Sequence, residues 1–76
     1  MRTFQFELTA EFIELNKLLK YLGVAESGGA ARALVASGAV SVDGAVELRK
    51  ACKIREGQTV QTGDVTIAVL APNPKG

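Results

Sequence analysis

Histidine is absent from this sequence and cysteine occurs once, which removes the residues of most familiar active sites. Histidine is the commonest general base and metal ligand, and a thiolate zinc site needs several cysteines. The chain also has no Walker loop, dinucleotide fingerprint or nucleophile elbow. The carboxylates of Glu11 and Glu14 could adjoin, but such a pair at a helix start usually complements the helix dipole. We therefore expect no enzyme, no cofactor, no metal and no small-molecule substrate.

The single cysteine, Cys52, cannot close an internal disulfide. A secreted domain of this size usually needs several disulfides, so the composition favours a cytoplasmic protein. The most frequent role of such a cysteine is that of a small buried apolar side chain. The N-terminal residues alternate polar and apolar side chains and resemble no signal peptide, and no apolar run reaches membrane-spanning length. We expect no membrane partner.

Charge is unevenly distributed along a chain whose formal net charge is only +1. Residues 7–14 contain three glutamates and no base, whereas residues 49–55 contain four cations and no acid. A length of 76 residues corresponds to one domain, and an apolar content of 47% is enough for a core. We expect a single domain over residues 1–71 and a mobile tail over 72–76.

The first third of the chain predicts a strand followed by a helix. Phe4, Phe6 and Leu8 alternate with polar residues, as in a strand with one buried face. Thr9 is a candidate N-cap for a helix that ends at Gly23. Its apolar stripe would comprise Phe12, Leu15, Leu18, Leu19 and Leu22. Lys17 and Lys20 would then point outward together, with Ile13 unexplained between them.

A second helix is predicted between Ser27, a candidate N-cap, and Gly38, a candidate stop. Gly28 and Gly29 leave the first-turn amides uncovered, so an anion could approach them closely. Arg32 lies about one turn further along the same helix.

The second half of the chain predicts several short strands. Val40 and Val42, then Val46 and Leu48, flank the turn Asp43-Gly44, which is a strong hairpin signal. Further strands are expected near residues 59–61 and over residues 65–69. The fold class is therefore α+β, with two helices packed on one face of a small, mostly antiparallel sheet. The last strand could lie beside the first strand or beside the hairpin.

Cationic groups on separate elements could together hold phosphates. Two helices joined by a short loop would bring Lys17 and Lys20 close to Ser27 and Arg32, and the basic run 49–55 could lie nearby. The alternative is a set of scattered surface cations that keep the protein soluble.

Residues 15–60, LNKLLKYLGVAESGGAARALVASGAVSVDGAVELRKACKIREGQTV, resemble the S-four-type RNA-binding domain, also called the alpha-L motif. The similar features are Leu-Asn-Lys-x-Leu, a Ser-opened helix with Ala-Arg, Gly-x-Val-x-Val-Asp-Gly, and a later basic segment. The chain also resembles small stand-alone bacterial members of the YbcJ type, in which the domain is nearly the whole protein. The family usually has more basic residues at the second helix, and often Asn where Asp43 stands.

The resemblance implies a non-enzymatic module that binds structured RNA, ribosomal or transfer RNA, in translation or ribosome assembly. The residues that this reading and the charge pattern together assign to RNA are Asn16, Lys17, Lys20, Ser27, Gly28, Gly29, Arg32, Asp43, Gly44, Arg49, Lys50, Lys53 and Arg55. The alternative is an adaptor that docks on ribosomal proteins or assembly factors, which the low net charge and the acidic segment 7–14 favour.

Overall fold

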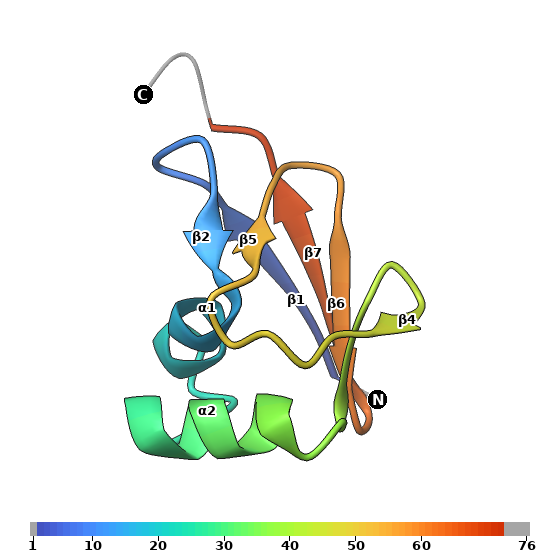
Figure 1. The fold of residues 1–76 in the computed structure, drawn as a ribbon. Helices are drawn as coiled ribbons and strands as arrows, with labels where there is room; N and C mark the ends of the chain where they lie inside the picture. Colours follow the sequence, from blue (N-terminus) through green and yellow to red (C-terminus); the bar gives the residue numbers. More distant parts are fainter. Residues whose placement is uncertain (1, 73–76) are drawn as a thin grey trace.

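The structure, a computed structural model, describes residues 2–72. The elements in chain order are β1 (Arg2–Glu7), β2 (Ile13–Glu14), α1 (Leu15–Tyr21), α2 (Gly28–Ala36), β3 (Val40–Val42), β4 (Ala45–Val46), β5 (Lys53–Ile54), β6 (Thr59–Thr62) and β7 (Val65–Leu70) (Figure 1). The expected mobile tail begins at Pro72 and otherwise lies outside the described residues.

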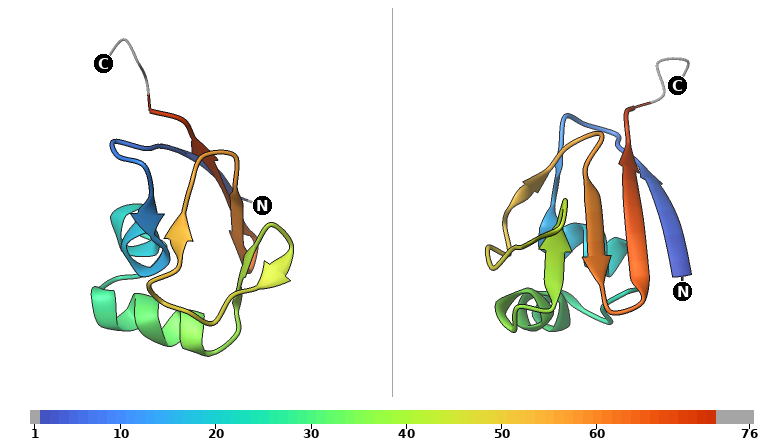
Figure 2. Two further views of the ribbon diagram at one scale, coloured as in Figure 1. Left: turned by 45° about the horizontal axis from the view of Figure 1, so that its top comes forward. Right: turned by 90° about the vertical axis from the view of Figure 1, so that its right-hand side faces the viewer.

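The main sheet has five strands in the order β1-β7-β6-β3-β4. Its neighbouring strands are antiparallel except β1 and β7, which run parallel from the Arg2–Val65 pair to the Glu7–Leu70 pair. The right-hand view of Figure 2 shows β7 between β1 and β6. The α+β class and the mostly antiparallel sheet are confirmed. The last strand lies beside the first strand, and β6 connects it to the hairpin.

A separate two-stranded ladder, β2 with β5, replaces the first part of the expected first helix. The prediction that the helix begins after Thr9 is wrong, because α1 begins at Leu15. Ile13 pairs with Ile54 in this ladder and packs against the core. This pairing supplies hydrogen-bond partners and burial that outweigh the local helix signals.

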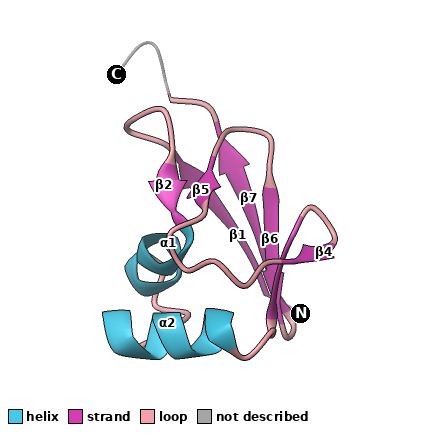
Figure 3. Cartoon of the chain, viewed as in Figure 1, coloured by secondary structure: helices cyan, strands magenta, loops and turns pink. Residues whose placement is uncertain are grey.

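Both helices lie on one side of the main sheet, and the core fills the space between them (Figures 1 and 3). Leu15, Leu18 and Leu19 of α1 are fully buried. Ala31 and Val35 of α2 are also fully buried, so their helical spacing of four residues forms the inward face of this helix. Their helix begins with the predicted cap, since Ser27 Oγ accepts a 3.1 Å hydrogen bond from the Ala30 amide.

The hairpin turn is confirmed at Asp43-Gly44, where both residues have positive φ, 51° and 86°. Asp43 also fixes the turn to β6, since its Oδ1 accepts a 2.9 Å hydrogen bond from the Thr59 amide. Strand β4 ends at Val46, so Leu48 lies outside the strand that was expected to include it.

Candidate functional site

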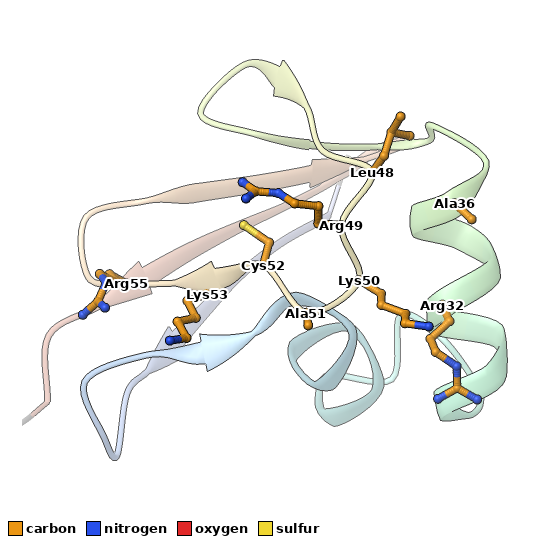
Figure 4. A pocket seen from close by; sticks show the side chains of 9 residues that line it. All are labelled: Arg32, Ala36, Leu48, Arg49, Lys50, Ala51, Cys52, Lys53 and Arg55. Carbon is orange, nitrogen blue, oxygen red and sulfur yellow. The ribbon is translucent and has the colours of Figure 1, made fainter.

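A groove of about 830 Å³ lies between α2 and the segment 48–55. The residues that line it are Arg32, Ala36, Leu48, Arg49, Lys50, Ala51, Cys52, Lys53 and Arg55. Five of the nine cations in the sequence therefore line one groove, and its lining includes no carboxylate side chain among residues 2–72. Figure 4 shows Arg32 and Lys50 at the end next to α2, with Lys53 and Arg55 toward the other end.

The start of α1 anchors the basic segment that forms one wall of this groove. The Leu15 amide donates to the Cys52 carbonyl at 2.9 Å, and the Asn16 amide donates to the Lys50 carbonyl at 3.0 Å. First-turn amides of a helix have no partner within the helix, so these two bonds satisfy them. They also fix the backbone of Lys50 and Cys52 close to α1.

Arg32 and Ala36 of α2 form the opposite wall, and the glycines at the start of this helix leave room for the Arg32 side chain. A Cβ added at Gly28 would lie 3.4 Å from Arg32 Nη1, and one added at Gly29 would lie 3.9 Å from Arg32 Nη2. The Arg32 guanidinium therefore folds back over the first turn of its own helix. It places a full positive charge beside amides that already favour an anion.

Arg49 is held by a neighbouring carboxylate. Its Nε and Nη2 donate to Glu47 at 2.9 and 3.3 Å, and its backbone amide donates to Glu47 Oε2 at 3.0 Å. The hydrogen bonds from Arg49 lower the pKa of the Glu47 carboxyl to about 2, so Glu47 remains charged at neutral pH. The Arg49 side chain remains 79% exposed while Glu47 is only 17% exposed. The ion pair offsets one groove charge but leaves the guanidinium accessible.

Cys52 lies in the groove, half-buried. Burial, followed by the nearby Glu47 carboxylate, raises the pKa of its thiol. Cys52 also packs against the core, in agreement with the apolar role expected from the sequence.

The side chains at the far end of the groove pack against an aromatic ring. Lys53 Nζ lies 4.9 Å and Arg55 Cζ 5.6 Å from the ring centroid of Phe12, both within cation–π range. Sequence reasoning placed Phe12 in a helical core and missed this contact. The alternation of Lys53 and Arg55 around the apolar Ile54 was the available signal for a strand with both cations on one face.

The other residues that the sequence assigned to RNA binding lie outside the groove lining. Lys17 and Lys20 are exposed on α1, and Lys17 Nζ lies 3.8 Å from Glu14 Oε1. Asn16 is half-buried, and its Oδ1 has no hydrogen-bond partner within residues 2–72. The Asp43-Gly44 turn is exposed, and the Asp43 carboxylate is used by its contact with β6. The structure therefore brings together Arg32 and the basic run, but not the α1 lysines.

A comparison with models of known protein families identifies the family of this chain. The model described as S4 domain matches residues 6–70. The chain belongs to the S4 domain family. A search of curated proteins finds no match for this S4 domain.

Among solved structures, this S4 domain is similar to YbcJ from E. coli, whose solution structure is described as revealing an alpha-L motif involved in RNA binding. The two chains are 47% identical and superpose with a TM-score of 0.69. The match covers 88% of this chain and 86% of YbcJ. The expected family and fold are thereby confirmed, and an RNA-binding module is supported.

Two further observations concern residues 2–72 of this S4 domain. Neither α1 nor α2 is long and apolar enough to cross a membrane. No three histidine, cysteine, aspartate or glutamate side chains within these residues lie close enough together to hold a metal ion.

Proposed function

We propose that this S4 domain binds phosphates of folded RNA along the groove between α2 and segment 48–55, without catalysing a reaction. The proposed ligand is ribosomal or transfer RNA, in translation or ribosome assembly, and the proposed location is the cytoplasm. The observation that carries the proposal is the gathering of five cations around a groove with no carboxylate in its described lining.

The groove supports backbone contacts better than base recognition. Its polar groups are mostly long cationic side chains, which suit phosphate oxygens. Double-stranded RNA has a major groove too narrow for side chains to read, so shape and backbone dominate its recognition. Aromatic residues make up only 5% of the sequence, and no aromatic side chain lines the groove within residues 2–72. Base stacking therefore contributes little in this proposal.

The candidates outside the groove extend the proposed contact surface. The first turn of α2 at Ser27, Gly28 and Gly29 adjoins Arg32, so a phosphate held by Arg32 would lie close to these amides. Lys17 and Lys20 on the exposed side of α1 would contact a second part of the same RNA. Asn16, Asp43 and Gly44 remain proposed contacts, with Asp43 acting mainly through the shape of its turn.

The test is a titration of the protein with a folded RNA, such as a transfer RNA, at two salt concentrations. Removal of Arg32 and Lys50 by alanine substitution should weaken binding more than removal of Lys17 and Lys20. Both pairs change the net charge equally, so the comparison separates the groove from the general electrostatic field. Equal losses for the two pairs would contradict the assignment of the groove.

A Gly28→Glu substitution probes the start of α2 separately. Its carboxylate would lie next to the Arg32 guanidinium and compete with phosphate for it. An acidic residue in the first turn is favourable for the helix, so thermal stability should not fall. Unchanged RNA affinity in this variant would remove the helix start from the site.

A protein-binding adaptor is the second candidate function. Val46 and Leu48 are each 61% exposed and lie just before the basic segment, where a protein partner could cover them. An adaptor of this kind would show no RNA binding at low salt, or binding that salt does not change. That result in the titration would replace the RNA proposal.

A further inference from the structure

Phe12 is a half-buried aromatic residue that does not pack against the hydrophobic core among the described residues. It lies between β1 and β2, directly before Ile13. Phe4 and Ile13 are half-buried residues that pack against the core cluster, whereas Phe12 does not belong to that set among residues 2–72. The Lys53 and Arg55 side chains lie over its ring instead, at 4.9 and 5.6 Å from the centroid.

The pairing of β2 with β5 explains why the ring meets both cations. Ile13 opposes Ile54, and Ile54 is fully buried. Neighbouring residues on a strand point to opposite faces, so Lys53 of β5 and Arg55, directly after β5, point to the same outer side. Continuing the antiparallel register by one residue sets Phe12 opposite Arg55, with Lys53 diagonal to it.

Lys53 and Arg55 line the groove, whereas Phe12 does not. The ring can therefore act on RNA binding only through these two cations. Long cationic side chains lose rotamer freedom when they are fixed on a phosphate. A ring that already restricts Lys53 and Arg55 reduces this loss, and it leaves their N–H groups free to donate, since the attraction is to the ring face.

We propose that Phe12 is a positioning residue of the groove, which holds the Lys53 and Arg55 side chains in the orientation that receives phosphate. The proposal rests on the proposed function, since it assigns a role within the same groove. It goes further by adding a side chain that makes no contact with the RNA.

The test is RNA affinity in Phe12→Leu, which keeps an apolar side chain but removes the ring. Affinity at low salt should fall about 3- to 10-fold, because the Lys53 and Arg55 side chains would then lose more rotamer freedom when they bind phosphate. The slope of log affinity against log salt should stay unchanged, since the same cations still meet phosphates. Phe12→Tyr, which retains the ring, should bind as the wild type does.

Phe4→Leu is the matched control. The Arg2 guanidinium lies 5.2 Å from the Phe4 ring centroid, but neither residue lines the groove. This variant removes a contact of the same kind elsewhere and should leave RNA affinity unchanged. Amide spectra of each variant establish that the fold is retained. In the free wild type, the side-chain methylene protons of Lys53 should be shifted upfield by the ring, and this shift should disappear in Phe12→Leu.

A double-substitution experiment distinguishes positioning from other roles. With Lys53 and Arg55 both replaced by alanine, Phe12→Leu should cause no further loss of affinity. A further loss in that background would show a direct or structural role and overturn the proposal. If the wild type binds and loss of the two cations weakens binding, but Phe12→Leu binds like the wild type, this inference alone fails. If the wild type shows no salt-dependent RNA binding, the proposed function fails and this inference fails with it.

Discussion

Replacement of Glu47 by glutamine should strengthen RNA binding and increase its dependence on salt. Glu47 accepts three hydrogen bonds from Arg49 and so offsets one of the groove cations. Glutamine has nearly the same shape and retains a carbonyl oxygen for the Arg49 amide, but it carries no charge. The substitution therefore frees Arg49 for a phosphate while keeping the shape of the side chain beside it.

The size of the effect follows from the cations of the groove. Five cations line it, and within residues 2–72 Arg49 is the one that forms an ion pair. Each phosphate neutralised contributes about 0.7 to 0.9 to the salt slope, so the contribution of the groove to the slope should rise from about 2.8–3.6 to about 3.5–4.5. Between about 50 and 200 mM salt, the groove contacts alone should lower affinity about 50- to 150-fold for the wild type and about 130- to 500-fold for Glu47→Gln.

Fluorescence anisotropy with a labelled folded RNA over this salt range measures both slopes. Asp64→Asn is the control, because it removes one negative charge in the turn between β6 and β7, away from the groove lining. It should change the slope less than Glu47→Gln does. Weaker binding of Glu47→Gln at every salt concentration would refute the reasoning, since Glu47 would then orient Arg49 rather than compete for it.

Three other outcomes are expected. Asp43→Ala should lower the free energy of unfolding by about 1–2 kcal/mol, because the Thr59 amide loses its hydrogen-bond acceptor and alanine tolerates a positive φ poorly. Urea denaturation measures this loss, and it should be smaller for Asp43→Asn. The pKa of the Glu47 carboxyl is lowered from 4.5 to about 2, so its contribution to stability is complete above pH 4.5 and is lost as the pH falls toward 2. The difference in the free energy of unfolding between the wild type and Glu47→Gln should therefore shrink over this range, as measured by unfolding at a series of acid pH values. Cys52, whose thiol pKa is raised by burial and by Glu47, should react with iodoacetamide more slowly than a free cysteine at neutral pH, and mass spectrometry should show faster reaction in Glu47→Gln.

Local sequence signals identified the elements whose residues are close together in the chain. Ser27 caps α2 as predicted, and Asp43-Gly44 closes the hairpin, because capping and tight turns depend on a few neighbouring residues. The first helix was predicted five residues too early, because Thr9 resembles an N-cap and Phe12 falls on the helical stripe, whereas the observed N-cap is Glu14. The true arrangement depends on β5, which lies far along the chain.

The sequence likewise predicted one part of the candidate site and missed another. The basic run was visible because its charges are contiguous, and the groove lining includes all four of its cations. The ion pair between Glu47 and Arg49 depends on side-chain orientation, and the contact of Phe12 with Lys53 and Arg55 depends on the β2–β5 register. Neither can be obtained from spacing alone, because both require knowledge of which backbone segments meet.

The parallel pairing of β1 with β7 affects how the chain folds as it is synthesised. The first strand of this domain is paired with its last strand, from Arg2 with Val65 to Glu7 with Leu70. Contacts between such distant residues slow folding, because a large loop must close before they form. Strand β1 therefore stays without its sheet neighbour until β7 has been synthesised, so the edge of the main sheet that β1 forms is completed last.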